Sequence, residues 1–288
     1  MAESIRQNVK IRRTDPQSFL LFFLVHLAAL LTMLALLFII IYILVKGIPH
    51  LTPDLFSRTY TSENVSLFPA LINTLLITVV SLLFAVPVGV GAAIYLTEYA
   101  RRGNKLVGIT GVAAETLSGI PSIVYGLFGS LFFVKYLGFG LSLLSGSLTL
   151  SIMILPLIMR TTEEALKSVP DSYREGSFGL GAGKLRTVFS IVLPCAVPGI
   201  LSGIILGVGR IVGESAALIF TAGTVAETAS SIFSSARTLS VHMYSISGEG
   251  LYIGQTYATA VVLLAVVILI NAVSNYAAKK IGGERTDG

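Results

Sequence analysis

Two residues of opposite charge stand four positions apart within a long apolar stretch of the sequence. Arg210 lies near the middle of residues 189–222, and Glu214 follows it. A spacing of four places both side chains on one face of a helix, where a guanidinium can bind an anion and a carboxylate can pair with the guanidinium. Each charge costs roughly 2.5–3.5 kcal/mol at the centre of a bilayer. The pair therefore predicts an ion pair that locks a helix contact, a polar path for an anionic solute, or both.

Small residues continue this helical face toward the N-terminus. Gly199, Gly203 and Gly207 recur every four residues, a spacing that lets two membrane helices approach closely. We expect this stripe to pack against another helix. A further acid within an apolar stretch, Glu115, is expected near the membrane surface, with a role in helix contact or gating.

Other motifs in the chain lack a part that their chemistry requires. Residues 179–184 resemble a phosphate-binding loop, but Phe178 and Leu185 stand where that loop needs a glycine and a hydroxyl residue. No metal-ligand spacing connects the three histidines, His26, His50 and His242. Serine, histidine and acidic residues form no recognisable hydrolase pattern. The sequence therefore predicts no nucleotide, metal or catalytic site on this chain, and an intramembrane enzyme is the weaker alternative.

The elements that must position these residues are those of a membrane protein. Of the 288 residues, 54% are hydrophobic and 12% are charged, and this charged share is about half that of a soluble domain. The composition excludes a soluble enzyme and a disordered protein. A disulfide scaffold is excluded because Cys195 is the only cysteine. We therefore expect an all-α membrane protein.

Six apolar runs are long enough to cross a bilayer. They comprise residues 19–45, 70–96, 106–137, 141–159, 189–222 and 252–278. The first run is longer than the apolar part of a signal peptide, so it is expected to be a retained span. The predicted organisation is a tail at 1–18, the first span at 19–45, an external loop at 46–69, a five-span core at 70–278 and a tail at 279–288.

The basic residues predict how the chain is oriented. With six spans, fifteen of the twenty lysines and arginines fall on the side that holds both termini, four fall on the other side, and Arg210 lies in a span. Basic residues mark the cytoplasmic side, so both termini are expected in the cytoplasm. The net charge of +5 then reflects topology, not binding to nucleic acid. The external residues 223–250 are expected to include a short helix over 231–244 on the membrane surface.

One cytoplasmic segment, residues 161–190, is too long and too patterned to be a simple connection. A short helix is expected from Thr161, with two glutamates in its first turn and Pro170 at its end. Asp171 or Ser172 can cap a second helix, which ends in a glycine cluster before a third helical run. The pattern predicts a cytoplasmic helical hairpin, and it favours a docking surface for a partner over a purely structural cap.

The hairpin resembles a known motif. Glu175, Gly176 and Ser177 are followed after three residues by Gly181, and after nine more by a run that contains Ile191, Leu193 and Pro194. This spacing is similar to the EAA loop in the membrane subunits of type I ABC importers, with small residues in place of both alanines. The resemblance implies a MetI-like permease fold in which this hairpin is the coupling helix that docks into an ATPase subunit.

Residues 70–278 resemble the permeases of phosphate ABC importers more narrowly. The stretches that carry the likeness are residues 119–128, 160–166 and 209–223, and they are closer to the PstA type than to the PstC type. The resemblance implies that Arg210 and Glu214 take part in phosphate translocation, with Arg160 at the cytoplasmic end of the fourth span.

The same resemblance implies a set of partners in the cell membrane. They are a second, PstC-like permease, a dimer of ATPase subunits that would hold ATP and magnesium, and an external phosphate-binding protein. The chain itself would carry no cofactor and would not be an enzyme. An importer of molybdate, sulfate or another solute with this architecture stays open. A secondary transporter is the alternative from another class, although no inverted repeat is evident, and a non-transport anchor would leave the intramembrane charges unexplained.

Overall fold

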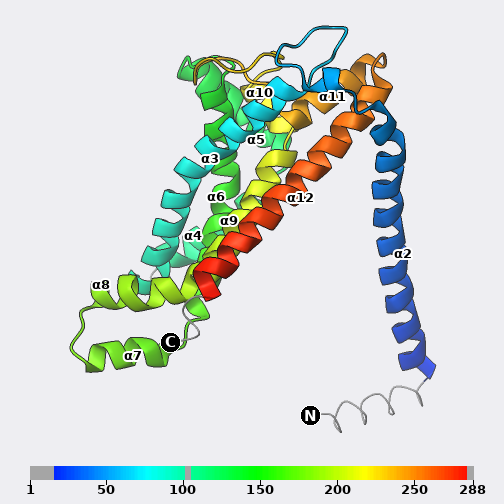
Figure 1. Ribbon diagram of the computed structural model, residues 1–288. Helices are drawn as coiled ribbons and strands as arrows, with labels where there is room; N and C mark the ends of the chain where they lie inside the picture. The colour runs from blue at the N-terminus through cyan, green and yellow to red at the C-terminus, as the bar shows by residue number, and fades with distance from the viewer. Residues whose placement is uncertain (1–15, 101–104, 284–288) are drawn as a thin grey trace.

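The computed structural model describes residues 16–100 and 105–283, and all regular structure within them is helical. The helices form a bundle with short helices at both of its ends (Figure 1). The central helix is α6 (Leu143–Lys167), which packs against α3 (Phe68–Ile94) and α9 (Leu193–Gly213). In the most apolar 18-residue stretch of α6, 67% is buried inside the protein, against 28% in the corresponding stretch of the span that contains α3. The core of the bundle therefore lies along α6.

The sequence of α6 explains its central place. Leu150, Ile154 and Ile158 follow one another at intervals of four residues, so they share one helical face, and all three are fully buried. Hydroxyl side chains next to them in the sequence are buried as well. Thr149 and Ser151 donate to carbonyls four residues earlier, at 2.7 and 2.6 Å, so these polar side chains are satisfied within the helix. Small and apolar side chains together allow neighbouring helices to pack closely against α6.

Within the part of the chain that the structure describes, five helical stretches are long and apolar enough to cross a membrane. A bent pair of helices makes a sixth if the two form one broken span. The five are α2 (Pro16–Gly47), α3 with η3 (Tyr95–Tyr99), α6, the continuous run of α8 (Lys184–Thr187), η5 (Val188–Val192) and α9, and α12 (Ile253–Gly283). The expectation of an all-α membrane bundle is therefore confirmed.

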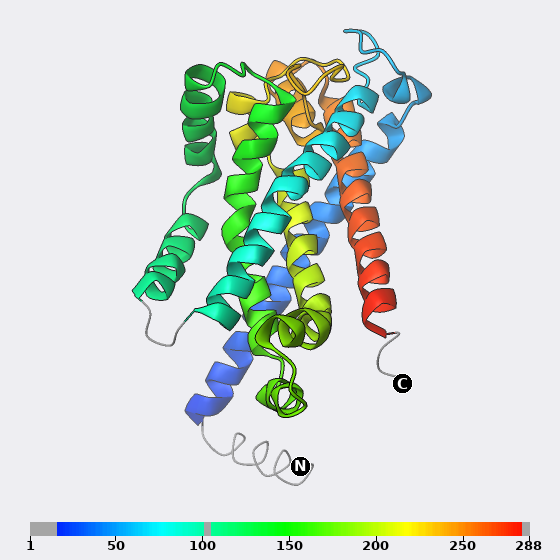
Figure 2. The same ribbon diagram turned by 90° about the vertical axis from the view of Figure 1, so that its left-hand side faces the viewer.

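The third predicted span is broken by a bend of 102°. It consists of α4 (Lys105–Ser118), followed by α5 (Ser122–Gly129) and the π-helical turn η4 (Ser130–Tyr136), which lie along one side of the bundle in Figure 2. Pro121 has no amide hydrogen and takes an extended ψ of 141°, so the helix stops there. The Tyr125 hydroxyl donates to the Leu117 carbonyl at 2.7 Å, which satisfies one group freed by the break. A proline inside an apolar run thus ends one helix, and the next begins with a large change of direction.

Helix α2 stands apart from the rest of the bundle (Figure 1). None of the most apolar 18-residue stretch of α2 is buried. The helix contacts α12 and the short η1 (Ile48–His50). The start of α2 and the end of α12 lie toward the end of the molecule that carries α7 (Asp171–Gly179) and α8. The expected loop between the first two spans contains η1 and η2 (Pro53–Phe56).

The short helix expected over 231–244 on the membrane surface begins later, and one of its faces is buried against the bundle. It is α11 (Leu239–Glu249), and its residues Leu239, Val241 and Ile246 are fully buried. Two local contacts set its start. Thr238 accepts a hydrogen bond from the Val241 amide at 3.4 Å, and the Leu239 amide donates to the Thr74 hydroxyl of α3 at 2.9 Å. The helix therefore starts where a cap and a contact with a distant helix coincide.

The packing of α11 predicts a pH-dependent stability. Burial, with the nearby charge of Arg237, lowers the pKa of His242 to about 4, below its ordinary value of about 6.5. The unfolded chain then binds more protons between pH 6.5 and 4, so the free energy of unfolding falls as the pH drops through this range. We expect a loss of about 3 kcal/mol, measured as a lower melting temperature in detergent at pH 4.5 than at pH 7. The neutral variant His242→Gln should lose this dependence, and an equal dependence in both proteins would contradict the assignment.

The hairpin that we expect in the cytoplasm is shorter than the sequence predicted. Residues 161–167 are not a separate helix but the last turns of α6. Two ion pairs between residues four positions apart stabilise these turns: Lys167–Glu163 at 3.1 Å and Arg160–Glu164 at 3.6 Å. The expected capping by Asp171 or Ser172 is also wrong, because the cap position of α7 is occupied by Pro170, with no side-chain capping bond. The hairpin proper consists of α7 and α8.

Candidate functional site

Arg210 lies in the last turn of α9 and is half-buried. Among the residues that the structure describes, no carboxylate lies within 4.0 Å of the guanidinium. The charge of Arg210 is therefore available to an anion from outside the chain.

Glu214 does not continue the face that carries Arg210. The helix ends at Gly213, and Glu214 is extended, with φ −77° and ψ 128°, so the spacing of four no longer brings the two side chains together. The Glu214 carboxylate instead accepts a hydrogen bond from the Ala217 amide at 3.1 Å, in the first turn of α10 (Ala216–Thr221). Its backbone carbonyl accepts one from the Ser240 hydroxyl at 2.5 Å. Glu214 thus shapes the break that follows α9.

The glycine stripe of α9 lies against α6 of the same chain. A Cβ atom added at Gly199 would lie 2.6 Å from that of Ala165, and one at Gly203 would lie 2.7 Å from that of Thr161. Gly207 faces the core beside α6 with more room, since the nearest side-chain atom would be 3.8 Å away. The stripe therefore allows α9 to pack closely against α6 within the same chain.

Arg160 is not brought together with Arg210. The contacts of the glycine stripe show that α6 and α9 run antiparallel, so Arg160 lies about 9 Å further along the bundle, toward the hairpin. It is exposed, and it lines a cavity of about 310 Å³ between α4 and α6. Glu115 lines the same cavity. Arg160 and Glu115 thus lie toward the end of the bundle that carries the hairpin, and Arg210 lies further from it.

The residues of the predicted EAA loop lie on and after the hairpin. Glu175, Gly176 and Gly181 are exposed, whereas Ser177 is buried and shares a hydrogen bond of 2.8 Å with Thr187 of α8. Ile191 belongs to η5, and Leu193 and Pro194 begin α9. A group of large apolar side chains is exposed on the hairpin, and sequence reasoning did not single it out: Tyr173, Phe178, Leu180, Leu185 and Phe189. An exposed apolar group of this kind marks a surface for a partner.

The turn of the hairpin depends on Gly181, which has a φ of +82°. A residue with a Cβ atom in this left-handed conformation costs roughly 1–2 kcal/mol. We expect Gly181→Ala to lower co-purification of an ATPase partner several-fold. The matched control is Gly183→Ala, because Gly183 has an ordinary φ of −73° and open space around it. Equal co-purification of both variants would contradict the role of the turn.

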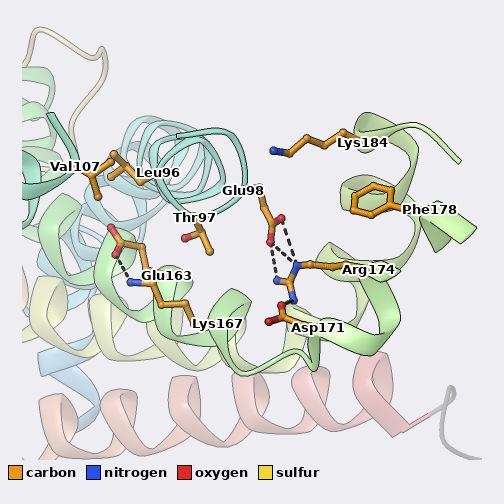
Figure 3. A pocket seen from close by; sticks show the side chains of 10 residues that line it. All are labelled: Leu96, Thr97, Glu98, Val107, Glu163, Lys167, Asp171, Arg174, Phe178 and Lys184. Carbon is orange, nitrogen blue, oxygen red and sulfur yellow. Dashed lines mark hydrogen bonds and ion pairs between the residues drawn. The ribbon is translucent and has the colours of Figure 1, made fainter. Parts of the chain in front are cut away.

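A polar cavity of about 680 Å³ lies between the hairpin and the ends of α3 and α6, as Figure 3 shows. Arg174 of α7 points to Glu98 of η3, and the guanidinium binds the carboxylate at 2.7 Å. The hydrogen bond to Glu98 raises the pKa of Arg174, so the arginine stays charged. Sequence reasoning missed this pair, because 76 positions separate its members.

Comparison with known proteins agrees with this architecture. Residues 85–283 match the family described as binding-protein-dependent transport system inner membrane component. The probable ABC transporter permease protein YqgI of Bacillus subtilis (strain 168) is 35% identical over 257 residues, which cover 84% of this chain and 86% of that protein. The phosphate transport system permease protein PstA of Mycobacterium leprae (strain TN) is 40% identical over 156 residues, 54% of this chain and about half of that protein.

A solved structure supports the fold. A chain of a bacterial alginate ABC transporter, crystallised with its alginate pentasaccharide-bound periplasmic protein, superposes with a TM-score of 0.67. The match covers 92% of this chain and 96% of that chain at 16% identity. At this identity the likeness concerns the arrangement of helices alone.

Proposed function

The chain belongs to the family of binding-protein-dependent transport system inner membrane components, and on that premise we propose that it is one of two permease subunits in an ATP-driven phosphate importer. It would form half of the translocation path in the cell membrane, with both termini in the cytoplasm. The name of the PstA relative supports phosphate as the solute. The chain would be a transporter subunit without a catalytic site of its own.

Arg210 is the observation that carries this proposal. It is a half-buried guanidinium at the end of a membrane helix, with no carboxylate in ion-pairing range among the described residues. A guanidinium presents paired N–H donors that fit the oxygens of phosphate. An anion that passes α9 would therefore find a charge that the protein does not itself neutralise.

Binding on a transport path must be weak enough for the ion to leave. Glu214 would contribute to this indirectly. Its carboxylate accepts a hydrogen bond in the first turn of α10. This contact would fix the break after α9, and with it the position of Arg210 in the last turn of α9. Arg160, further toward the hairpin, would meet the anion at the cytoplasmic end of the path.

The hairpin of α7 and α8 would dock the ATPase subunits, which would bind ATP and magnesium. Its exposed apolar side chains, Tyr173 and Leu180 among them, suit a cleft on that partner. Closure of the ATPase dimer would displace the hairpin, and the bundle would change from inward-facing to outward-facing. A PstC-like permease would complete the path, and an external binding protein would deliver phosphate to the end that carries α10 and α11.

Uptake by the reconstituted complex tests the solute and the energy source together. With ATP inside the vesicles and the binding protein outside, we expect labelled phosphate to accumulate. An excess of sulfate or molybdate should not compete. Stronger uptake of either competitor would assign the chain to another oxyanion importer, and uptake driven by an ion gradient without ATP would support a secondary transporter.

A further inference from the structure

Arg174 joins three helical elements through one guanidinium. It binds both carboxylate oxygens of Glu98 in η3, with the shortest distance at 2.7 Å. It also donates to the carbonyls of Leu166, at 2.9 Å, and Val169, at 2.8 Å, at and just beyond the end of α6. The donors of the guanidinium thus connect α7, where Arg174 lies, to the ends of α3 and α6.

The Glu98 contact is buried, unlike the other ion pairs of the described chain. The exposed fractions are 15% for the Arg174 side chain and 7% for the Glu98 side chain, whereas at least one partner of each other pair is more than 60% exposed. Arg174 also contacts Asp171, but that carboxylate is 78% exposed. A buried bidentate pair holds its geometry, while exposed pairs contribute little.

Helix α7 reaches the other membrane helices by a different route. It packs against α8 and η5, which continue into α9 and not into α3. On the side of α3 it faces the 680 Å³ cavity, whose lining includes Leu96, Val107 and Phe178. Figure 3 shows Arg174 and Glu98 meeting at this cavity. A second contact, Lys184 over the ring of Tyr99 at 5.2 Å, involves two exposed side chains.

We propose that the Arg174–Glu98 pair is the joint that transmits movement of the hairpin to the end of α3 and to the start of the broken span. Arg174 and Glu98 are positioning residues, since they act on the path through the helices that they connect. The proposal rests on the proposed function for the source of the movement, an ATPase that docks on the hairpin. Because Leu96 of η3 packs in the same apolar cluster as Ala114 of α4, a pull on Glu98 reaches the segment that leads to the bend at Pro121.

Removal of the Glu98 carboxylate tests the joint, because it leaves the bonds of Arg174 to α6 in place. A spin label at Ile109, an exposed residue of α4, reports movement independently of the solute when Cys195 is replaced by serine. In the complex with the native pair, we expect trapping of ATP with vanadate to change the spectrum of this label. In Glu98→Ala the change should be lost while the ATPase still co-purifies, and phosphate uptake per ATP should fall at least about tenfold, a change equivalent to about 1.4 kcal/mol.

Asp171→Asn is the matched control, since it removes the exposed contact of the same arginine. It should keep the spectral change and stay within about twofold of the uptake per ATP of the unaltered complex.

An unchanged spectral response in Glu98→Ala, or an equal loss in Asp171→Asn, would overturn the joint. If Glu98→Ala does not assemble, Glu98→Gln is measured in its place, and failure of both to assemble would assign the pair to assembly instead. A complex that responds to ATP at Ile109 but does not take up phosphate would refute the proposed solute and leave the joint standing.

Discussion

Replacing Arg210 by glutamine is expected to lower phosphate uptake about 100-fold in a complex that still assembles. A hydrogen bond to a charged group contributes about 1.5–3 kcal/mol, and each 1.36 kcal/mol corresponds to a tenfold change in rate. Arg210 can form such bonds with a passing anion because no carboxylate of the described chain neutralises it. Uptake of labelled phosphate and recovery of the whole complex are measured separately.

Arg210→Lys is the informative control for this prediction. Lysine keeps the positive charge but loses the paired donors of the guanidinium, so we expect an intermediate rate of uptake. Unchanged uptake in Arg210→Gln would remove the residue from the path. If both variants fail to assemble, the residue serves a helix contact. The absence of an ion pair with Glu214 already makes a charge-locked contact the weaker of the two interpretations that the sequence left open.

Much of the fold was predictable because it depends on local composition and spacing. A bilayer requires long apolar helices, and the positions of the spans followed from that requirement. The hairpin turn was marked by a glycine cluster, and Gly181 indeed takes a left-handed conformation. Pro121 breaks the third apolar run, as a proline inside a helical run does. In each case the determinant is a few neighbouring residues.

Features that depend on distant contacts were not predictable in the same way. The spacing of Arg210 and Glu214 indicates a shared helical face only if the helix continues, and α9 ends at Gly213. The extended conformation of Glu214 is held by Ser240, 26 positions later. The Arg174–Glu98 pair likewise joins segments that are unrelated in sequence. Candidate residues such as Arg210 could therefore be proposed from the sequence, but the contacts that they make, and the Arg174–Glu98 pair itself, required the structure.

Substitution of Gly203 by alanine is expected to disrupt the packing of α6 against α9. The added methyl group would lie 2.7 Å from the Cβ atom of Thr161 and still closer to its hydroxyl. Thr161 is on a buried helix and cannot turn away freely, so the two helices must separate. Overpacking of this kind costs about 3 kcal/mol, which outweighs the roughly 1 kcal/mol that alanine gains over glycine in a helix. We expect a lower melting temperature and poor recovery of the complex.

Two further variants separate a steric effect from a general intolerance of α9. Gly209→Ala adds the same methyl group to the same helix at a position with no atom within 4 Å, so it should leave the melting temperature unchanged or raise it. Adding Thr161→Gly to Gly203→Ala removes the clashing side chain from the partner helix and should restore most of the loss. If the double variant is no more stable than Gly203→Ala, contact between α6 and α9 does not limit stability. Recovery would instead show that the stripe serves the interior of this subunit, which leaves the outer faces of the bundle for its partners.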